Sequence, residues 1–214
     1  MTRIALIHAL AHSVEPINEA LAQAWPQATR MNLLDDSLSA DLARSGTGLD
    51  ADMHARFGTL ADYAVSTGAQ AILFTCSAFG PCIEMVARKH AGIPVLKPNE
   101  AMVQDAVDMG GRVGLVASFA PTLASMPPEF PVSTDLQCAL AVGAMDALNR
   151  GDLAAHDRAV VAVAQELAAA GCSVIALAQF SMARAAPAAR EALGLPVLTT
   201  PESAVRALQS RLSR

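Results

Sequence analysis

Short apolar runs alternate with longer amphipathic segments along the whole chain. The apolar runs predict strands at Ile4–His8, Ala28–Leu33, Ala71–Thr75, Pro94–Leu96, Arg112–Ala117, Ser173–Ala178 and Pro196–Leu198. These runs are largely continuous instead of alternating, which is typical of parallel strands covered on both faces. Helical spacing predicts helices at Val14–Ala24, Leu49–Ser66, Pro81–Lys89, Glu100–Met109, Leu136–Asn149, Leu153–Ala169, Met182–Ala192 and Glu202–Leu212. This alternation predicts an α/β fold with right-handed crossovers.

Two of the remaining segments predict loops. Ala40–Asp52 is polar and leads into a predicted helix. Pro121–Pro131 carries four prolines, which make it too stiff for a regular helix. We expect this second loop to line the functional site or to gate its mouth.

The pattern of the first half recurs in the second. Gly68 opens a strand run that ends at Cys76, and Gly171 opens a run that ends at Gln179. The sequence Gly-x-Pro-Val-Leu occurs at 92–96 and again at 194–198. Two copies of one α/β unit are the simplest interpretation, although unrelated α/β units also look alike. We predict domains at 1–98 and 99–201, and leave open whether the C-terminal helix at 202–214 packs back on the first domain.

The duplication predicts where a ligand binds. Ligands of open parallel sheets bind beyond the carboxyl ends of the strands. Two such ends, related by a pseudo-twofold axis and facing each other, would form one active-site cleft between the domains. Cys76 and Gln179 would then occupy equivalent positions on opposite walls of that cleft.

Composition and charge narrow the class of partner. Fifteen Lys and Arg against twenty Asp and Glu give a net charge of −5, and the chain has one Trp, one Tyr and no basic run. These features argue against nucleic acid and against an anionic membrane surface as partners. No stretch approaches the roughly 18 apolar residues of a membrane span. The four cysteines form no C-x-x-C pair and have no His at ligand spacing, so we expect reduced thiols, no metal site and a cytoplasmic location.

Cys76 is the strongest candidate for chemistry. It follows a predicted strand directly, and Pro81 indicates that a helix begins just beyond it. Free backbone N–H groups and the positive helix end predict a lowered thiol pKa and a place for an anion. The alternative is a buried structural cysteine, which is what we expect of Cys82, Cys138 and Cys172.

The segment Phe74-Thr75-Cys76-Ser77-Ala78 resembles the first cysteine motif of the aspartate/glutamate racemase superfamily. The resemblance continues through Ala117–Thr122 and a second motif at Ile175–Met182. It implies cofactor-independent chemistry, in which one cysteine removes a proton from the substrate's α-carbon and a second cysteine delivers one to the opposite face. Backbone amides and hydroxyls would hold the carboxylate and stabilise the enediolate. The resemblance is also compatible with a homodimer.

Carried over residue by residue, the resemblance makes Cys76 the first catalytic cysteine. It assigns carboxylate-holding positions to Ser77, Ala78, Ser118 and Thr122, with Ala78 able to contribute only its backbone N–H. Phe180 and Ser181 are further candidates for substrate binding. Ser13 is the repeat partner of Thr122 and is a further candidate for the same anion. His8 ends the first strand and points either into the cleft or into the core.

Gln179 stands where the superfamily has its second cysteine. A primary amide neither removes nor delivers a proton near neutral pH, so three functions stay open. The first is Cys76-assisted proton transfer at the α-carbon of a small carboxylate, of the racemase or isomerase type. The second is single-cysteine decarboxylation of a malonate-like acid, with Gln179 bonded to the substrate. The third is a catalytically silent carboxylate-binding protein, in which Gln179 caps a neighbouring helix.

Overall fold

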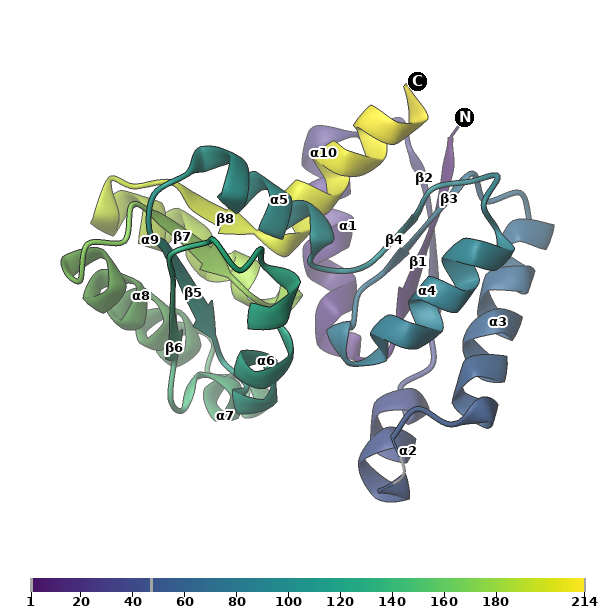
Figure 1. Ribbon diagram of the computed structural model, residues 1–214, viewed down its shortest axis with the longest axis horizontal. Coiled ribbons are helices and arrows are strands. Elements are labelled where there is room, and N and C mark those ends of the chain that lie inside the picture. Colours follow the sequence, from purple (N-terminus) through teal and green to yellow (C-terminus); the bar gives the residue numbers. More distant parts are fainter. Residues whose placement is uncertain (1, 47, 214) are drawn as a thin grey trace. The chain divides into compact units, whose positions relative to one another are not determined.

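The computed structural model describes residues 2–46 and 48–213 and contains two four-stranded parallel sheets (Figure 1). The first has the order β2-β1-β3-β4, built from β1 (Arg3–His8), β2 (Thr29–Leu34), β3 (Ala71–Phe74) and β4 (Val95–Leu96). The second has the order β6-β5-β7-β8, built from β5 (Val113–Ala117), β6 (Leu136–Leu140), β7 (Val174–Leu177) and β8 (Val197–Thr199). The predicted α/β fold class is confirmed.

Helices connect the strands in both halves. The α-helices are α1 (Val14–Ala24), α2 (Ser37–Ser45), α3 (Ala51–Ser66), α4 (Gly80–Lys89), α5 (Glu100–Met109), α6 (Ala120–Ser125), α7 (Ala144–Asn149), α8 (Leu153–Ala169), α9 (Ala186–Leu193) and α10 (Thr200–Leu212). Short 3₁₀ helices occur at η1 (Ala11–Ser13), η2 (Ser77–Phe79), η3 (Pro127–Glu129) and η4 (Phe180–Ala185). None of the helices in the described ranges is long and apolar enough to cross a membrane.

The chain divides into two compact units. Unit 1 consists of Met1–Pro98 and Ala204–Arg214, and unit 2 consists of Asn99–Ser203. The last helix, α10, returns to unit 1, where the Gln209 side-chain amide donates to the Ala24 carbonyl at the end of α1, 3.0 Å away. Figure 1 shows this helix in yellow beside α1. Unit 1 is therefore assembled from both ends of the chain.

The two sheets repeat the same pairing. β1 pairs with β3 so that Ile7 lies opposite Phe74, and β5 pairs with β7 so that Val116 lies opposite Leu177. Gly68 and Gly171, which precede β3 and β7, both have positive φ, +87° and +91°. A backbone in this region favours glycine, which ends the preceding helix and starts the strand. Strand order, register and turn together support the repeat inferred from the sequence.

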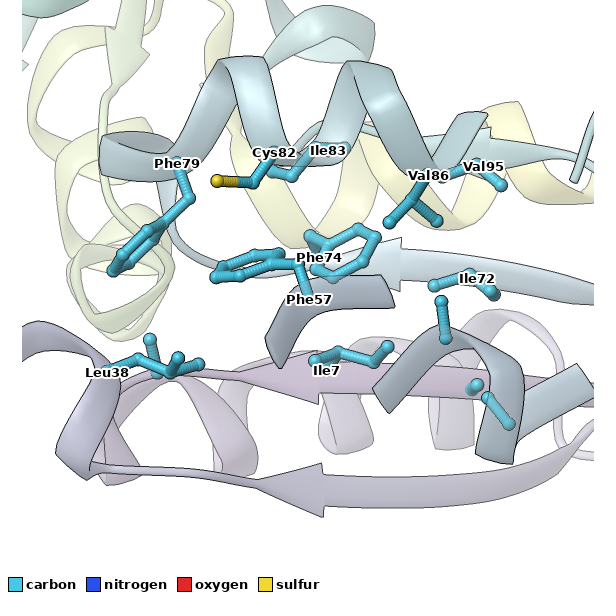
Figure 2. Close-up of a cluster of buried hydrophobic side chains, with 14 of the residues drawn as sticks. Ile7, Leu38, Phe57, Ile72, Phe74, Phe79, Cys82, Ile83, Val86 and Val95 are labelled. Carbon is cyan, nitrogen blue, oxygen red and sulfur yellow. The ribbon is translucent and has the colours of Figure 1, made fainter. Parts of the chain in front are cut away.

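Alternation along the strands divides unit 1 into two layers. Ile7 and Phe74 point to the face covered by α3 and α4, where Phe57 stacks on Phe74 at 5.4 Å and packs against Phe79 at 4.8 Å between ring centroids (Figure 2). Leu38 of α2 closes one end of this cluster. Side chains of opposite parity, such as His8, point to the other face of the sheet. Consecutive residues at a strand's end are thus sent into different environments.

Unit 2 has a buried cluster on each face of its sheet. One cluster joins β5 and β7 to α8 and α9, and the other joins them to α5 and to β8. Gly114 on β5 permits a close approach, because a Cβ there would lie 2.8 Å from Ile175 Cδ1 and 3.1 Å from Leu167 Cβ. Glycine is therefore required at this position by packing.

Three predicted elements are wrong. The helix predicted over Leu136–Asn149 is two elements, edge strand β6 and helix α7, separated at Gly143, whose φ is +78°. The spacing of apolar residues in this segment fits a helix, but β6 pairs in parallel with β5, and this pairing makes it a strand. Cys138 therefore lies exposed on a strand, and the expectation that it is a buried structural cysteine is also wrong.

The other two errors are loops that turn out to be helical. The first part of the polar segment at 40–52 belongs to α2, whose Leu38 is fully buried on the core of unit 1. The proline-rich segment at 121–131 contains α6 and η3. Three of its four prolines, Pro121, Pro127 and Pro128, lie in the first turn of these short helices, where the missing N–H has no helical partner to lose.

Candidate active site

Cys76 lies just beyond the carboxyl end of β3, where the chain leaves the sheet and turns into η2 and then α4. Its backbone is extended, with φ −131° and ψ 122°, and Pro81 begins α4 as predicted. Cys76 continues the parity of Phe74, so its side chain faces the α2–α4 side of the sheet, where it packs against the core of unit 1. The residue is half-buried.

The environment of the Cys76 sulfur differs from the prediction. Burial raises the pKa of the Cys76 thiol, and this outweighs the lowering by the Ala78 N–H and by the Ser39 hydroxyl. The expected lowering of the thiol pKa is therefore wrong in direction. The local donors exist, as the sequence implied, but removing the sulfur from water disfavours the thiolate more strongly than they favour it.

A tight crevice adjoins the sulfur. It is lined by residues of β1, α2, α3 and β3, together with Cys76 itself: Ile7, His8, Ala9, Leu38, Phe57 and Phe74. Most of these side chains are apolar and fully buried. The Ser39 hydroxyl donates to the Ala9 carbonyl over 3.1 Å, which fixes α2 beside the end of β1. Helix α2 thus covers the thiol from one side.

His8 and Ser13 belong to a buried polar network on the opposite face of the sheet. His8 Nδ1 lies 2.9 Å from Thr75 Oγ1 and 3.1 Å from Ser13 Oγ, and these two hydroxyl oxygens are 2.8 Å apart. His8 Nε2 lies 3.0 Å from Asn32 Oδ1. The side chain of His8 is fully buried, and burial lowers its pKa. Of the two orientations left open by the sequence, the structure has the interior one.

The hydrogen bonds of Asn18 determine the tautomer of His8. Asn18 Nδ2 donates to the Val14 carbonyl, which fixes the orientation of that amide, and it also donates to Asn32 Oδ1 at 2.8 Å. Asn32 Oδ1 is then an acceptor, so His8 Nε2 must carry the proton. The lone pair of Nδ1 accepts from a hydroxyl. The Thr75 hydroxyl at 2.9 Å and the Ser13 hydroxyl at 3.1 Å both lie within hydrogen-bond distance of it.

Gln179, Ser118 and Thr122 form a group at the end of the unit 2 sheet. Gln179 Oε1 accepts from the Ser118 N–H at 2.8 Å and from the Ser118 hydroxyl at 3.3 Å. Gln179 Nε2 donates to Thr122 Oγ1 at 3.4 Å. Ser118 and Thr122 are both buried, each 6% exposed, and Gln179 is half-buried. Candidates from two sequence segments, Ala117–Thr122 and Ile175–Met182, are thus brought together within unit 2.

The remaining candidates lie in the 3₁₀ helices that follow the two strand ends. Ser77 is half-buried and Ala78 is exposed in η2. Phe180 is buried in η4, and Ser181 beside it is half-buried. Cys76 belongs to unit 1 and Gln179 to unit 2.

Three residues of these groups were not identified from the sequence. Thr75 has the parity of His8, so strand alternation alone could have paired the two. Asn32, a polar residue within a predicted strand, was a second available signal. Ser39 gave no signal, because the helix that carries it was not recognised. In the described part of the chain, no three His, Cys, Asp or Glu residues come together as metal ligands would.

Solved racemase structures share this fold. A glutamate racemase of Bacillus anthracis matches with a TM-score of 0.72 over 99% of this chain and 82% of its own, at 11% identity. The aspartate racemase of Picrophilus torridus gives 0.71 over 98% and 94%, at 12% identity. The allantoin racemase of Klebsiella pneumoniae gives 0.70 over 100% and 88%, at 19% identity. At such identities the likeness concerns the fold alone.

Sequence comparison supplies the family. No curated protein matches the chain. The family model described as Asp/Glu/Hydantoin racemase, however, matches residues 9–124, which is more than half of the chain and includes Cys76. The resemblance drawn from the motifs is thereby confirmed. This chain belongs to the Asp/Glu/hydantoin racemase family.

Proposed function

We propose that the chain catalyses cofactor-independent proton transfer at the α-carbon of a small carboxylate, with Cys76 as the acid–base group. The observation that carries the proposal is the position of Cys76. It follows β3 at the carboxyl end of a parallel sheet, where α/β proteins bind ligands, and its sulfur meets the Ala78 N–H and the Ser39 hydroxyl. Family membership supports a racemase-type enzyme.

The protonation state of Cys76 decides whether it more readily delivers a proton to the α-carbon or removes one. Burial raises its thiol pKa, so the resting group at neutral pH is a thiol and therefore a proton donor. A thiol delivers a proton to an enediolate carbon and becomes a thiolate. The Ala78 N–H stabilises this thiolate, and the Ser39 hydroxyl adds to it when its proton turns from the Ala9 carbonyl to the sulfur. Removing a proton first requires that the thiol lose its own. The balance favours protonation of a carbanionic intermediate over its formation.

Gln179 also favours chemistry in which Cys76 is the only acid–base group. Its amide has no usable acid or base function, and both of its polar atoms bond to Ser118 and Thr122. A second candidate function is therefore decarboxylation of a malonate-like acid. Loss of CO₂ leaves the electron pair of the broken C–C bond in an enediolate, and the Cys76 S–H protonates its carbon. Water then reprotonates the thiolate.

Deuterium incorporation tests both candidates. Enantiopure amino acids, hydroxy acids and α-substituted malonates are incubated with the protein in D₂O and followed by NMR and chiral chromatography. Racemisation gives α-deuterated product of inverted configuration. Decarboxylation gives CO₂ and one enantiomer of an α-deuterated acid. Because general acid–base catalysis is worth about 10²–10⁴-fold, Cys76→Ser is expected to lower the rate by at least about 100-fold.

Cys138→Ser is the matched control, because Cys138 is an exposed thiol on edge strand β6. Its rate is expected to equal that of the wild type. Gln179→Cys supplies a thiol at the second motif and is expected to increase racemisation if symmetric chemistry is accessible to this chain. Binding of carboxylates without deuterium incorporation or CO₂ would contradict the proposal and favour a silent carboxylate-binding protein.

A further inference from the structure

The side chain of Gln179 occupies two hydrogen-bond donors of unit 2 that have the character of an anion site. The Ser118 N–H and O–H converge on one sp² oxygen, Gln179 Oε1, at 2.8 and 3.3 Å. The shorter distance is that of a well-formed hydrogen bond. A backbone amide and a hydroxyl converging on a single oxygen are the donors that bind carboxylate and enediolate oxygens in enzymes.

The orientation of the Gln179 amide follows from its neighbours. If the amide were rotated by 180°, its NH₂ group would face the Ser118 N–H, and two donors would oppose each other. With the oxygen toward Ser118, the nitrogen instead meets an acceptor, Thr122 Oγ1. The amide oxygen therefore accepts from the Ser118 donors, and the amide nitrogen donates to Thr122.

The corresponding place in unit 1 is built differently. The shared register aligns Ala9 and Cys76 of unit 1 with Ser118 and Gln179 of unit 2. Ala9 has no hydroxyl, and its carbonyl accepts from Ser39 of α2. The arrangement of Ser118 with an amide oxygen on it is thus particular to unit 2, and it is not a requirement of the repeated sheet.

We propose that Gln179 is a specificity-determining residue whose carboxamide oxygen occupies an oxyanion site on Ser118, so that a carboxylate oxygen binds there only by displacing it. A substrate carboxylate oxygen would have to displace an acceptor that the chain itself supplies at high effective concentration. A small side chain at this position opens the site. The inference rests on the proposed function, since it describes how one part of the candidate site selects its ligand. Its test measures binding without turnover, so its failure leaves the Cys76 chemistry untouched.

Formate is the probe, and the Ser118 amide is the reporter. Sodium formate is titrated into ¹⁵N-labelled wild type and Gln179→Ala, with sodium chloride at the same ionic strength as the reference. Gln179→Ala is expected to show a saturable shift of the Ser118 amide resonance, with a Kd for formate at least about fivefold lower than in the wild type. A fivefold change in Kd corresponds to about 1 kcal/mol, the net worth of one hydrogen bond that Gln179 no longer makes to Ser118 in the variant.

Two further variants complete the design. Gln179→Glu keeps an sp² oxygen in place and is expected to show no saturable shift at neutral pH. Gln179→Ser opens the same donors with a polar side chain and replaces Gln179→Ala if that variant does not fold. A folded opened variant without a saturable Ser118 shift would overturn the proposal, as would equal formate affinity in the wild type and the opened variant.

Discussion

Replacement of His8 by glutamine tests the buried network of unit 1. The His8 ring is fully buried, carries its proton on Nε2 toward Asn32 and presents Nδ1 to the Thr75 and Ser13 hydroxyls. Glutamine can keep the donor to Asn32 but not the acceptor for the hydroxyls. The hydroxyls keep each other and the Leu10 and Ile7 carbonyls as partners, so the change removes one net hydrogen bond. The free energy of unfolding of His8→Gln is therefore expected to fall by about 0.5–1.5 kcal/mol at pH 7.5.

The pH dependence of the difference in the free energy of unfolding between wild type and His8→Gln is the stricter test. Burial lowers the pKa of His8 in the folded state, so as the pH falls below about 6.5 the unfolded chain takes up a proton that the folded chain does not. Wild-type stability is therefore complete above this pH and is lost as the pH decreases, with a slope of up to about 1.4 kcal/mol per pH unit. His8→Gln lacks this proton, so the two stability curves are expected to converge between pH 7.5 and pH 5.

The single tryptophan of the chain makes the assay specific for unit 1. Trp25 lies at the end of α1, so its fluorescence during urea unfolding reports on the unit that contains His8. His12→Gln is the control, because His12 is exposed in η1 and its replacement is expected to leave the free energy of unfolding at pH 7.5 unchanged. Parallel pH curves for wild type and His8→Gln would refute a buried neutral imidazole.

Two further predictions concern packing in unit 2 and the thiol of unit 1. Gly114→Ala inserts a methyl group 2.8 Å from Ile175 Cδ1 and is expected to lower the free energy of unfolding by about 1–3 kcal/mol, measured by thermal unfolding. Gly92→Ala is the control, because its new Cβ has no atom within 4 Å, and it is expected to leave the free energy of unfolding unchanged. Ser39→Ala removes a donor that lowers the Cys76 pKa, so the pH profile of Cys76 alkylation by iodoacetamide, read by peptide mass spectrometry, is expected to move to higher pH. An unmoved profile, or an equal movement in Ser45→Ala on the same helix, would contradict the role of Ser39.

The sheets could largely be read from the sequence, because their inner strands are buried on both faces and must be continuously apolar. Edge strand β6 was missed since it is half-exposed and its only strand neighbour in the sheet, β5, lies more than 20 residues earlier in the chain. The repeat itself held the missing signal. β2 begins 26 residues after β1, so a second copy starting at Val113 predicts a strand near residue 139.

The sequence places Cys76 and Gln179 just beyond two predicted strands, and in the structure they follow β3 and β7. Their roles in catalysis or binding stay a prediction. The sign of the Cys76 pKa shift could not be obtained in this way, because it depends on how far α2 shields the sulfur from water. The bonding of Gln179 to Ser118 could not be predicted either, because the sequence left open whether the amide binds a ligand or caps a neighbouring helix.

The return of α10 to unit 1 has a consequence for synthesis. During translation, the first 98 residues leave the ribosome long before residues 204–213, which complete the layer beside α1. Until these residues are synthesised, unit 1 lacks Val205 and Leu208, whose side chains are fully buried in the folded chain. A nascent chain that stops within unit 2 therefore has a first half, the one that carries the thiol, without part of its helical layer.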